Sequence, residues 1–114
     1  MKNELQLLKR VETFTLEIYP KLINFPKAEK YVLCSDIRSK LFNLHGVISQ
    51  ANYVKSKRLY YLQEAEADLE ALKFMIKLAR DRKYVSIGQY REIDLKLTEI
   101  GKMLSGYIKS TLNK

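Results

Sequence analysis

The fold is decided by the stretch from Arg58 to Leu112, which reads RLYYLQEAEADLEALKFMIKLARDR (58–82), KYVS (83–86) and IGQYREIDLKLTEIGKMLSGYIKSTL (87–112). Both long segments repeat apolar residues every three or four positions, which places these residues on one side of an α-helix. The positions are Leu59, Leu62, Leu69, Leu72, Met75, Ile76 and Ala79, then Ile87, Tyr90, Ile93, Leu97, Ile100, Leu104 and Ile108. Because the turn between the segments is short, the two helices are expected to pack against each other as an antiparallel pair.

The start of the last helix has its own signal. Ser86 is followed three residues later by Gln89, the pattern in which side chains and backbone amides cap each other, so the helix is predicted to begin at Ile87. Within it, Gly101 and Gly106 each destabilise a helix by roughly 1 kcal/mol relative to alanine. Gly101 and Ser105 share one face, where a neighbouring helix of the same chain or of another subunit could approach closely; an ordinary packing glycine is the alternative.

The N-terminal half predicts two further helices. The first, from about Asn3 to Ile23, ends at a tight corner formed by residues 24–26, because Pro26 disfavours the helical conformation at the residue before it and suits the first turn of the next helix. The second runs from about Lys27 to Tyr53. The expected buried stripes are Leu5, Leu8, Val11, Thr15, Ile18, Tyr19 and Leu22, then Tyr31, Cys34, Ile37, Leu41, Leu44, Ile48 and Ala51.

These elements predict an all-α fold, an antiparallel up-down four-helix bundle. A chain of 114 residues supports one hydrophobic core, so a single domain over residues 1–114 is expected. The sequence has two prolines and four glycines, which leaves little material for the turns of a sheet protein. Few, long helices joined by short connections follow from this composition.

Charge and cysteine content indicate the class of partner and the compartment. Lys and Arg number 21 against 13 Asp and Glu, a formal net charge of +8, so polyanions are the expected partners. A single cysteine fits a reducing compartment, and we find no leader pattern and no apolar run of about 20 residues. The sequence therefore predicts a cytoplasmic protein without membrane contact.

Two groups of cations are the first candidates for contact with nucleic acid or an acidic protein: Lys55, Lys57 and Arg58 where the second helix leads into the third, and Arg80, Arg82 and Lys83 at the end of the third. The alternative for each is an ordinary solvated helix end, and cations at the end of the third helix also favour its dipole. Arg38, Lys40 and Arg91 are weaker candidates, because their aliphatic stems can simply flank the core. Tyr60 and Tyr61 could stack on unpaired bases, although core or subunit packing explains such rings as well.

Residue types that support catalysis are present but not in a catalytic pattern. The acidic run Glu64, Glu66, Asp68 and Glu70 lacks the Glu-x-x-His pairs of a bundle di-iron site. His45, the one histidine, is interpreted as a packed or hydrogen-bonded residue, and Cys34 as a small buried thiol. No metal, no cofactor and no enzymatic activity are predicted.

Three segments carry a family resemblance: FPKAEKY (25–31), LARD (78–81) with YVS (84–86), and EIGKMLSGYIKS (99–110). From about Phe14 to Ser110 the chain resembles the four-helix-bundle family of the accessory variability determinant of diversity-generating retroelements and the proteins encoded in intervening sequences of 23S ribosomal RNA. The resemblance implies a homopentameric barrel of bundles without chemistry of its own. It also implies a positively charged surface that binds the retroelement reverse transcriptase and nucleic acid, RNA or DNA, during mutagenic copying of a template RNA.

The two branches of this family differ in the second helix. The intervening-sequence branch usually has a Ser-Ile-Pro-x-Asn-Ile-Ala-Glu-Gly-like stretch, whereas this chain reads LHGVISQAN (44–52), which favours the accessory branch. In the other direction, Ser105 and Tyr107 stand where accessory proteins often have Gly and Trp. A ribosome-associated RNA-binding protein of the intervening-sequence type, and a bundle whose oligomerisation is its whole role, therefore remain as alternatives.

Overall fold

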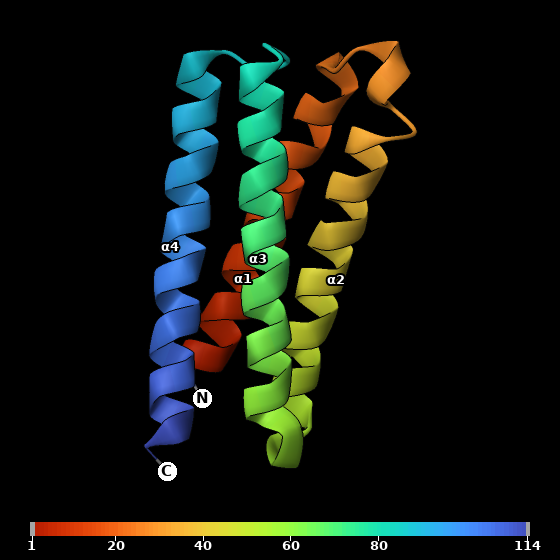
Figure 1. Cartoon of the computed structure of the whole chain (residues 1–114). Coiled ribbons are helices and arrows are strands. Elements are labelled where there is room, and N and C mark those ends of the chain that lie inside the picture. The colour runs from red at the N-terminus through yellow and green to blue at the C-terminus, as the bar shows by residue number, and fades with distance from the viewer. Residues whose placement is uncertain (1, 114) are drawn as a thin grey trace.

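The computed structural model describes residues 2–113, so Met1 and Lys114 of the expected domain lie outside it. Within this range the fold is all-helical, which confirms the predicted class. The four α-helices are α1 (Lys2–Ile18), α2 (Leu33–Tyr53), α3 (Arg58–Asp81) and α4 (Ile87–Leu112). They alternate in direction, with the α1–α2 and α3–α4 connections at one end of the bundle and the α2–α3 connection at the other (Figure 1). Three 3₁₀ helices lie in the connections: η1 (Tyr19–Asn24), η2 (Lys27–Glu29) and η3 (Lys55–Lys57).

One apolar core lies between the four helices. The main packed pairs are α2 with α3, α3 with α4, α1 with α2, and α1 with α4, so each helix has two neighbours. The largest fully buried side chains are Leu7, Phe14, Ile37, Leu41, Leu44, Ile48, Leu62, Leu72, Ile76, Leu97, Ile100 and Leu104. Because burying each such side chain contributes roughly 1.5–3 kcal/mol, this core is the main source of stability.

The buried stripe of α1 differs from the prediction. Leu5 is 64% exposed and Tyr19 is also exposed, whereas Leu7 and Phe14 are buried. Leucines at positions 5, 8 and 16 widen the apolar arc of this helix, so the same sequence permits a second stripe rotated by part of a turn. Packing against the other helices selects the stripe of positions 7, 11, 14 and 18.

The corner between α1 and α2 is longer than predicted, and both helix boundaries there were wrong. α1 ends at Ile18 instead of Ile23, because Pro20 has no amide hydrogen for the α-helical ladder and its ring would clash with the carbonyl of Leu16. α2 begins at Leu33 instead of Lys27, after the separate turn η2. Tyr31, expected in the buried stripe, is therefore 91% exposed. The extra turns allow Phe25 and Leu33 both to be buried.

The connection between α3 and α4 agrees with the prediction in detail. The Gln89 N–H donates to Ser86 Oγ at 3.1 Å and the Ser86 N–H donates to Gln89 Oε1 at 2.9 Å, which confirms the capping box and the start of α4 at Ile87. Ile87 itself is exposed and is not part of the buried stripe. At the preceding helix end, the Tyr84 N–H donates to the Ala79 carbonyl at 2.8 Å. This bond closes a Schellman turn that satisfies the last carbonyls of α3.

Lys83 occupies the left-handed position of this Schellman turn. Its φ of 64° is the one positive φ among the described residues. This position usually carries glycine, because a side chain there destabilises the backbone by roughly 1–2 kcal/mol. The chain therefore keeps a lysine where glycine would be more stable.

Candidate nucleic-acid interface

The predicted cations do not form one patch. Lys55 and Lys57 lie on η3 at one end of the bundle, and Arg82 and Lys83 lie after α3 at the other end (Figure 1). A 24-residue helix separates them, which corresponds to roughly 36 Å at 1.5 Å per residue. The molecule therefore presents two separate basic ends.

Arg58 does not contribute to either exposed surface. Its side chain is 8% exposed, and its Nε donates to the Ala51 carbonyl at 2.8 Å while Nη2 donates to the Asn52 carbonyl at 3.2 Å. Nη1 forms an ion pair with Glu4 at 3.3 Å, and the guanidinium lies 5.6 Å from the centre of the Tyr107 ring. The expectation of an exposed Arg58 is corrected, because this cation satisfies the last carbonyls of α2 and joins the helices.

Tyr107 of α4 belongs to the same group of contacts as Arg58. The Tyr107 hydroxyl donates to Asn52 Oδ1 at 2.8 Å, and Asn52 Nδ2 donates to the Glu4 carbonyl at 3.2 Å. Burial, the largest influence, raises the pKa of Tyr107 and keeps the phenol neutral. Residues from α1 to α4 are thus tied together at this end.

At the opposite end, two connections are brought together. The Tyr84 hydroxyl donates to Glu29 Oε2 at 2.8 Å, and the ring centroids of Phe25 and Tyr84 lie 5.5 Å apart. This contact places Lys27 and Lys30, which no pattern in the sequence singled out, at the same end as Arg82 and Lys83. We call these exposed cations, Lys27, Lys30, Arg82 and Lys83, the loop-end cluster. None of them forms an ion pair with a side chain that the structure describes.

The remaining basic candidates have more varied settings. Arg80 pairs with Asp81 at 2.9 Å and lies 4.5 Å from the centre of the Tyr90 ring, so part of its charge is balanced locally. Arg38 donates from Nη2 to the Lys30 carbonyl at 3.1 Å. Lys40 lies 3.4 Å from the buried carboxylate of Asp68, and Arg91 is exposed on the first turns of α4.

Several acids are neutralised along the side of the bundle where α1 and α4 meet. Arg10 pairs with Glu99, and Lys96 pairs with both Glu17 and Glu92. The hydrogen bond that Lys96 donates to Glu17, followed by the one that it donates to Glu92, raises the pKa of Lys96. The bond from Lys96 is also the main cause of the lowered pKa of Glu92. These pairs balance the carboxylates along this side, whereas the four cations of the loop-end cluster have no such partners among the described residues.

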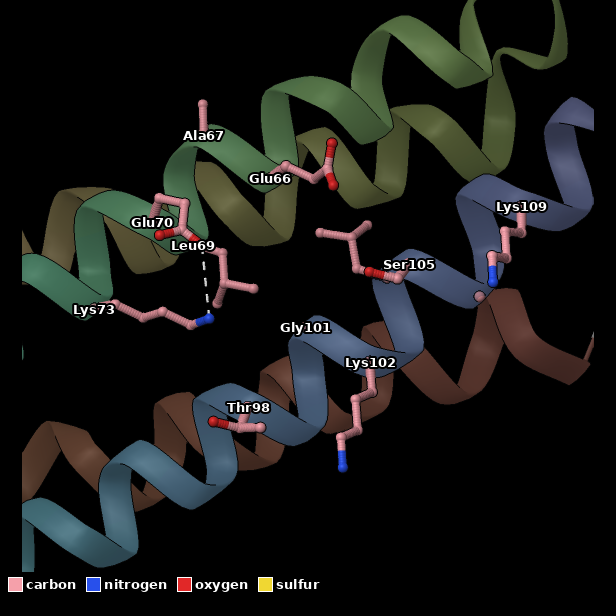
Figure 2. A pocket seen from close by; sticks show the side chains of 12 residues that line it. Glu66, Ala67, Leu69, Glu70, Lys73, Thr98, Gly101, Lys102, Ser105 and Lys109 are labelled. Carbon is pink, nitrogen blue, oxygen red and sulfur yellow. Dashed lines mark ion pairs between the residues drawn. The ribbon is translucent and has the colours of Figure 1, made fainter.

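The predicted packing face on α4 is open on its outer side. Gly101 and Ser105 line a groove of about 730 Å³ between α3 and α4 (Figure 2). A Cβ at Gly101 would lie 3.4 Å from Leu69 Cδ2, an ordinary contact, and Ser105 is exposed. A Cβ at Gly106 would meet nothing within 4 Å. Packing within this chain therefore accounts for neither Gly106 nor Ser105, and an approach by another subunit stays a prediction.

Cys34 and His45, whose residue types support catalysis in other proteins, have structural contacts here. Cys34 is buried, donates to the Leu22 carbonyl at 3.6 Å, and has a pKa raised mainly by burial, as expected for a packed thiol. His45 Nε2 lies 2.8 Å from Glu12 Oε2, so it is hydrogen-bonded. No group of three or more His, Cys, Asp or Glu side chains within residues 2–113 is arranged to hold a metal ion.

The fold and its surface define a small, basic four-helix-bundle protein with exposed, unpaired cations at both ends. A family model described as bAvd-like matches residues 5–111, and the chain therefore belongs to the bAvd-like family. This match confirms the resemblance to the accessory-determinant bundles and supports a non-catalytic role. No curated protein matches the sequence. In the part of the chain that the structure describes, no helix is long and apolar enough to cross a bilayer.

Proposed function

We propose that this protein is a non-catalytic accessory factor of a diversity-generating retroelement, acting in the cytoplasm, which binds the reverse transcriptase and nucleic acid through its basic ends. The family match supports the retroelement context. The observation that carries the binding role is the loop-end cluster, four exposed cations from two connections without described ion-pair partners. Cations placed this way attract phosphates and acidic proteins.

The conformation of Lys83 supports a role for its charge. A lysine with φ 64° is less stable than a glycine would be at this turn, and such positions concentrate at functional sites. A cation retained there, between Arg82 and the α4 cap, is consistent with contact to a polyanion.

Self-association would repeat the basic ends around a ring, and we propose the homopentamer that the family resemblance implies. An apolar surface supports this assembly. Leu16, Tyr19, Ile23 and Phe42 are exposed along α1, η1 and α2, with the Tyr19 and Phe42 rings 6.2 Å apart. Exposed apolar patches of this kind mark interfaces. The cations of each added subunit would contribute to the binding free energy of the whole assembly.

The experiment compares two variants with equal loss of charge. The first, K27Q/K30Q/R82Q/K83Q, removes the loop-end cluster; the control, K9Q/K77Q/K102Q/K109Q, removes four exposed cations from the sides of the helices. Binding to purified reverse transcriptase and to labelled template RNA is measured by fluorescence anisotropy, and subunit number by light scattering. The proposal expects loss of binding in the first variant only, with an unchanged pentamer mass. Equal binding by both variants, or a monomeric wild type, would refute it.

A further inference from the structure

A cleft lies between α2 and α3 beside η3, at the end of the bundle opposite the loop-end cluster. Its volume is about 580 Å³, within the range of small-ligand sites. The lining residues are Asn43, Val47, Gln50, Lys57, Tyr60, Tyr61 and Glu64. Aromatic rings, amide side chains, one carboxylate and one cation thus meet around a single hollow.

Tyr60 and Tyr61 form one aromatic side of the cleft. Tyr61 packs against the core, whereas Tyr60 is 57% exposed. Their ring centroids lie 5.3 Å apart in an edge-to-face arrangement, so the half-buried Tyr61 ring supports the exposed Tyr60 ring. The Glu64 charge, followed by its hydrogen bond with the phenol, raises the pKa of Tyr60 and keeps the ring neutral. An exposed, supported ring beside a cavity can stack on a planar group.

The polar groups of the cleft favour hydrogen-bond donors on the ligand. Asn43 Nδ2 donates to Asp68 Oδ2 at 2.6 Å, which fixes the amide and leaves Oδ1 as an acceptor. The Glu64 carboxylate is a second acceptor and would repel a phosphate entering the cleft. Carboxylates and amide oxygens accept hydrogen bonds from the amino groups of bases.

The cation of the cleft, Lys57, lies on η3 close to Lys55, and the two suit a phosphate backbone. Lys57 is exposed at the rim of the cleft, and Lys55 is exposed two residues away on the same 3₁₀ turn. Neither forms an ion pair with a side chain in the described range. In this arrangement the sugar-phosphate backbone of a nucleic acid follows η3 while one base turns into the cleft.

We infer that this cleft binds one unpaired nucleobase that carries an exocyclic amino group, with the adjoining phosphates held by Lys55 and Lys57. The inference rests on the proposed nucleic-acid binding and adds to it a preference for single strands. A base within a duplex is stacked and paired, so it cannot enter the cleft. Uracil presents one ring N–H and no amino group, and would bind more weakly than cytosine.

The test uses the full-length protein and fluorescein-labelled RNA 12-mers: a cytidine oligomer, a uridine oligomer, and a mixed single strand with and without its complement. Tyr60→Leu should weaken single-strand binding roughly ten-fold or more, the range seen for loss of one stacking ring. Phe74→Leu is the matched control, because Phe74 is exposed on α3 outside both this cleft and the loop-end cluster. Glu64→Gln should reduce the preference for cytidine over uridine. Circular dichroism verifies that each variant folds.

The outcomes separate this inference from the function on which it rests. Selective loss in Tyr60→Leu, with duplex binding unchanged, supports the cleft. Equal affinities of the Tyr60→Leu and Phe74→Leu variants for the single strand would overturn the cleft but leave nucleic-acid binding intact. If Tyr60→Leu lost only reverse-transcriptase binding, the cleft would take a protein and the inference would be wrong. If the wild type bound no nucleic acid near physiological salt, the proposed function itself would fail.

Discussion

Replacing Lys83 by glycine or by glutamine separates the effect of its backbone conformation on stability from the effect of its charge on RNA affinity. Lys83 has φ 64° in the Schellman turn after α3. A side chain in this conformation destabilises the folded state by about 1–2 kcal/mol, whereas glycine has a greater entropy loss on folding of about 0.5–1 kcal/mol. Lys83→Gly should therefore stabilise the protein by about 0.5–1 kcal/mol.

The assay is thermal unfolding followed by circular dichroism at one fixed protein concentration, since self-association makes the midpoint depend on concentration. For a domain of this size the gain corresponds to an increase in midpoint of about 2–6 °C. Lys83→Gln is the control, because it removes the charge and keeps the strained backbone. RNA affinity should fall in both variants, while the midpoint should rise only with glycine. An unchanged or lower midpoint for Lys83→Gly would refute the conformational argument, and unchanged affinity in both would refute the role of the charge.

Three further perturbations test the structural account. Arg58→Ala leaves the Glu4 carboxylate without this cation and the α2 carbonyls without their donor, so the free energy of unfolding should fall by about 3–5 kcal/mol in urea titrations; a loss below about 1 kcal/mol would contradict the burial of Arg58. Ser86→Ala removes the cap of α4 and should lower the free energy of unfolding by about 1 kcal/mol, with Ser39→Ala, an exposed serine within α2, as the neutral comparison. Burial raises the pKa of the Cys34 thiol, so the stability that goes with the neutral thiol is fully present below the ordinary thiol pKa and is lost as pH rises from that value through the raised one. The fall in the free energy of unfolding between pH 7 and pH 10 should be smaller in Cys34→Ala, and an identical fall would exclude Cys34 as its source.

The sequence was most informative where local chemistry determines the structure. The capping pair Ser86 and Gln89 and the regular stripe of α3 and α4 predicted that hairpin correctly, because each signal acts over a few residues. The stripe of α1 was predicted less well, since its leucines fit more than one face and only packing with the other helices decides between them. Pro20 was the overlooked signal for the end of α1.

The surface depended on contacts between residues that are distant in the sequence. Arg58, beside Lys55 and Lys57, has the sequence context of an exposed cation, but its partner Glu4 lies at the start of the chain. Lys27 and Lys30 join the loop-end cluster through the contact between Glu29 and Tyr84, which no local pattern predicts. The predicted up-down topology could have revealed this cluster, because it places the first and third connections at the same end of the bundle.

The central claim is that the loop-end cluster binds nucleic acid through phosphate contacts, and its most direct measurement is the salt dependence of RNA affinity. The logarithm of affinity should fall against the logarithm of salt concentration with a slope of about −0.7 per phosphate contact on single strands. If all four cations contact phosphates, the K27Q/K30Q/R82Q/K83Q variant should have a slope shallower by about 2.8 per engaged subunit. The control K9Q/K77Q/K102Q/K109Q should keep the wild-type slope. Equal slopes for wild type and the loop-end variant would contradict the account.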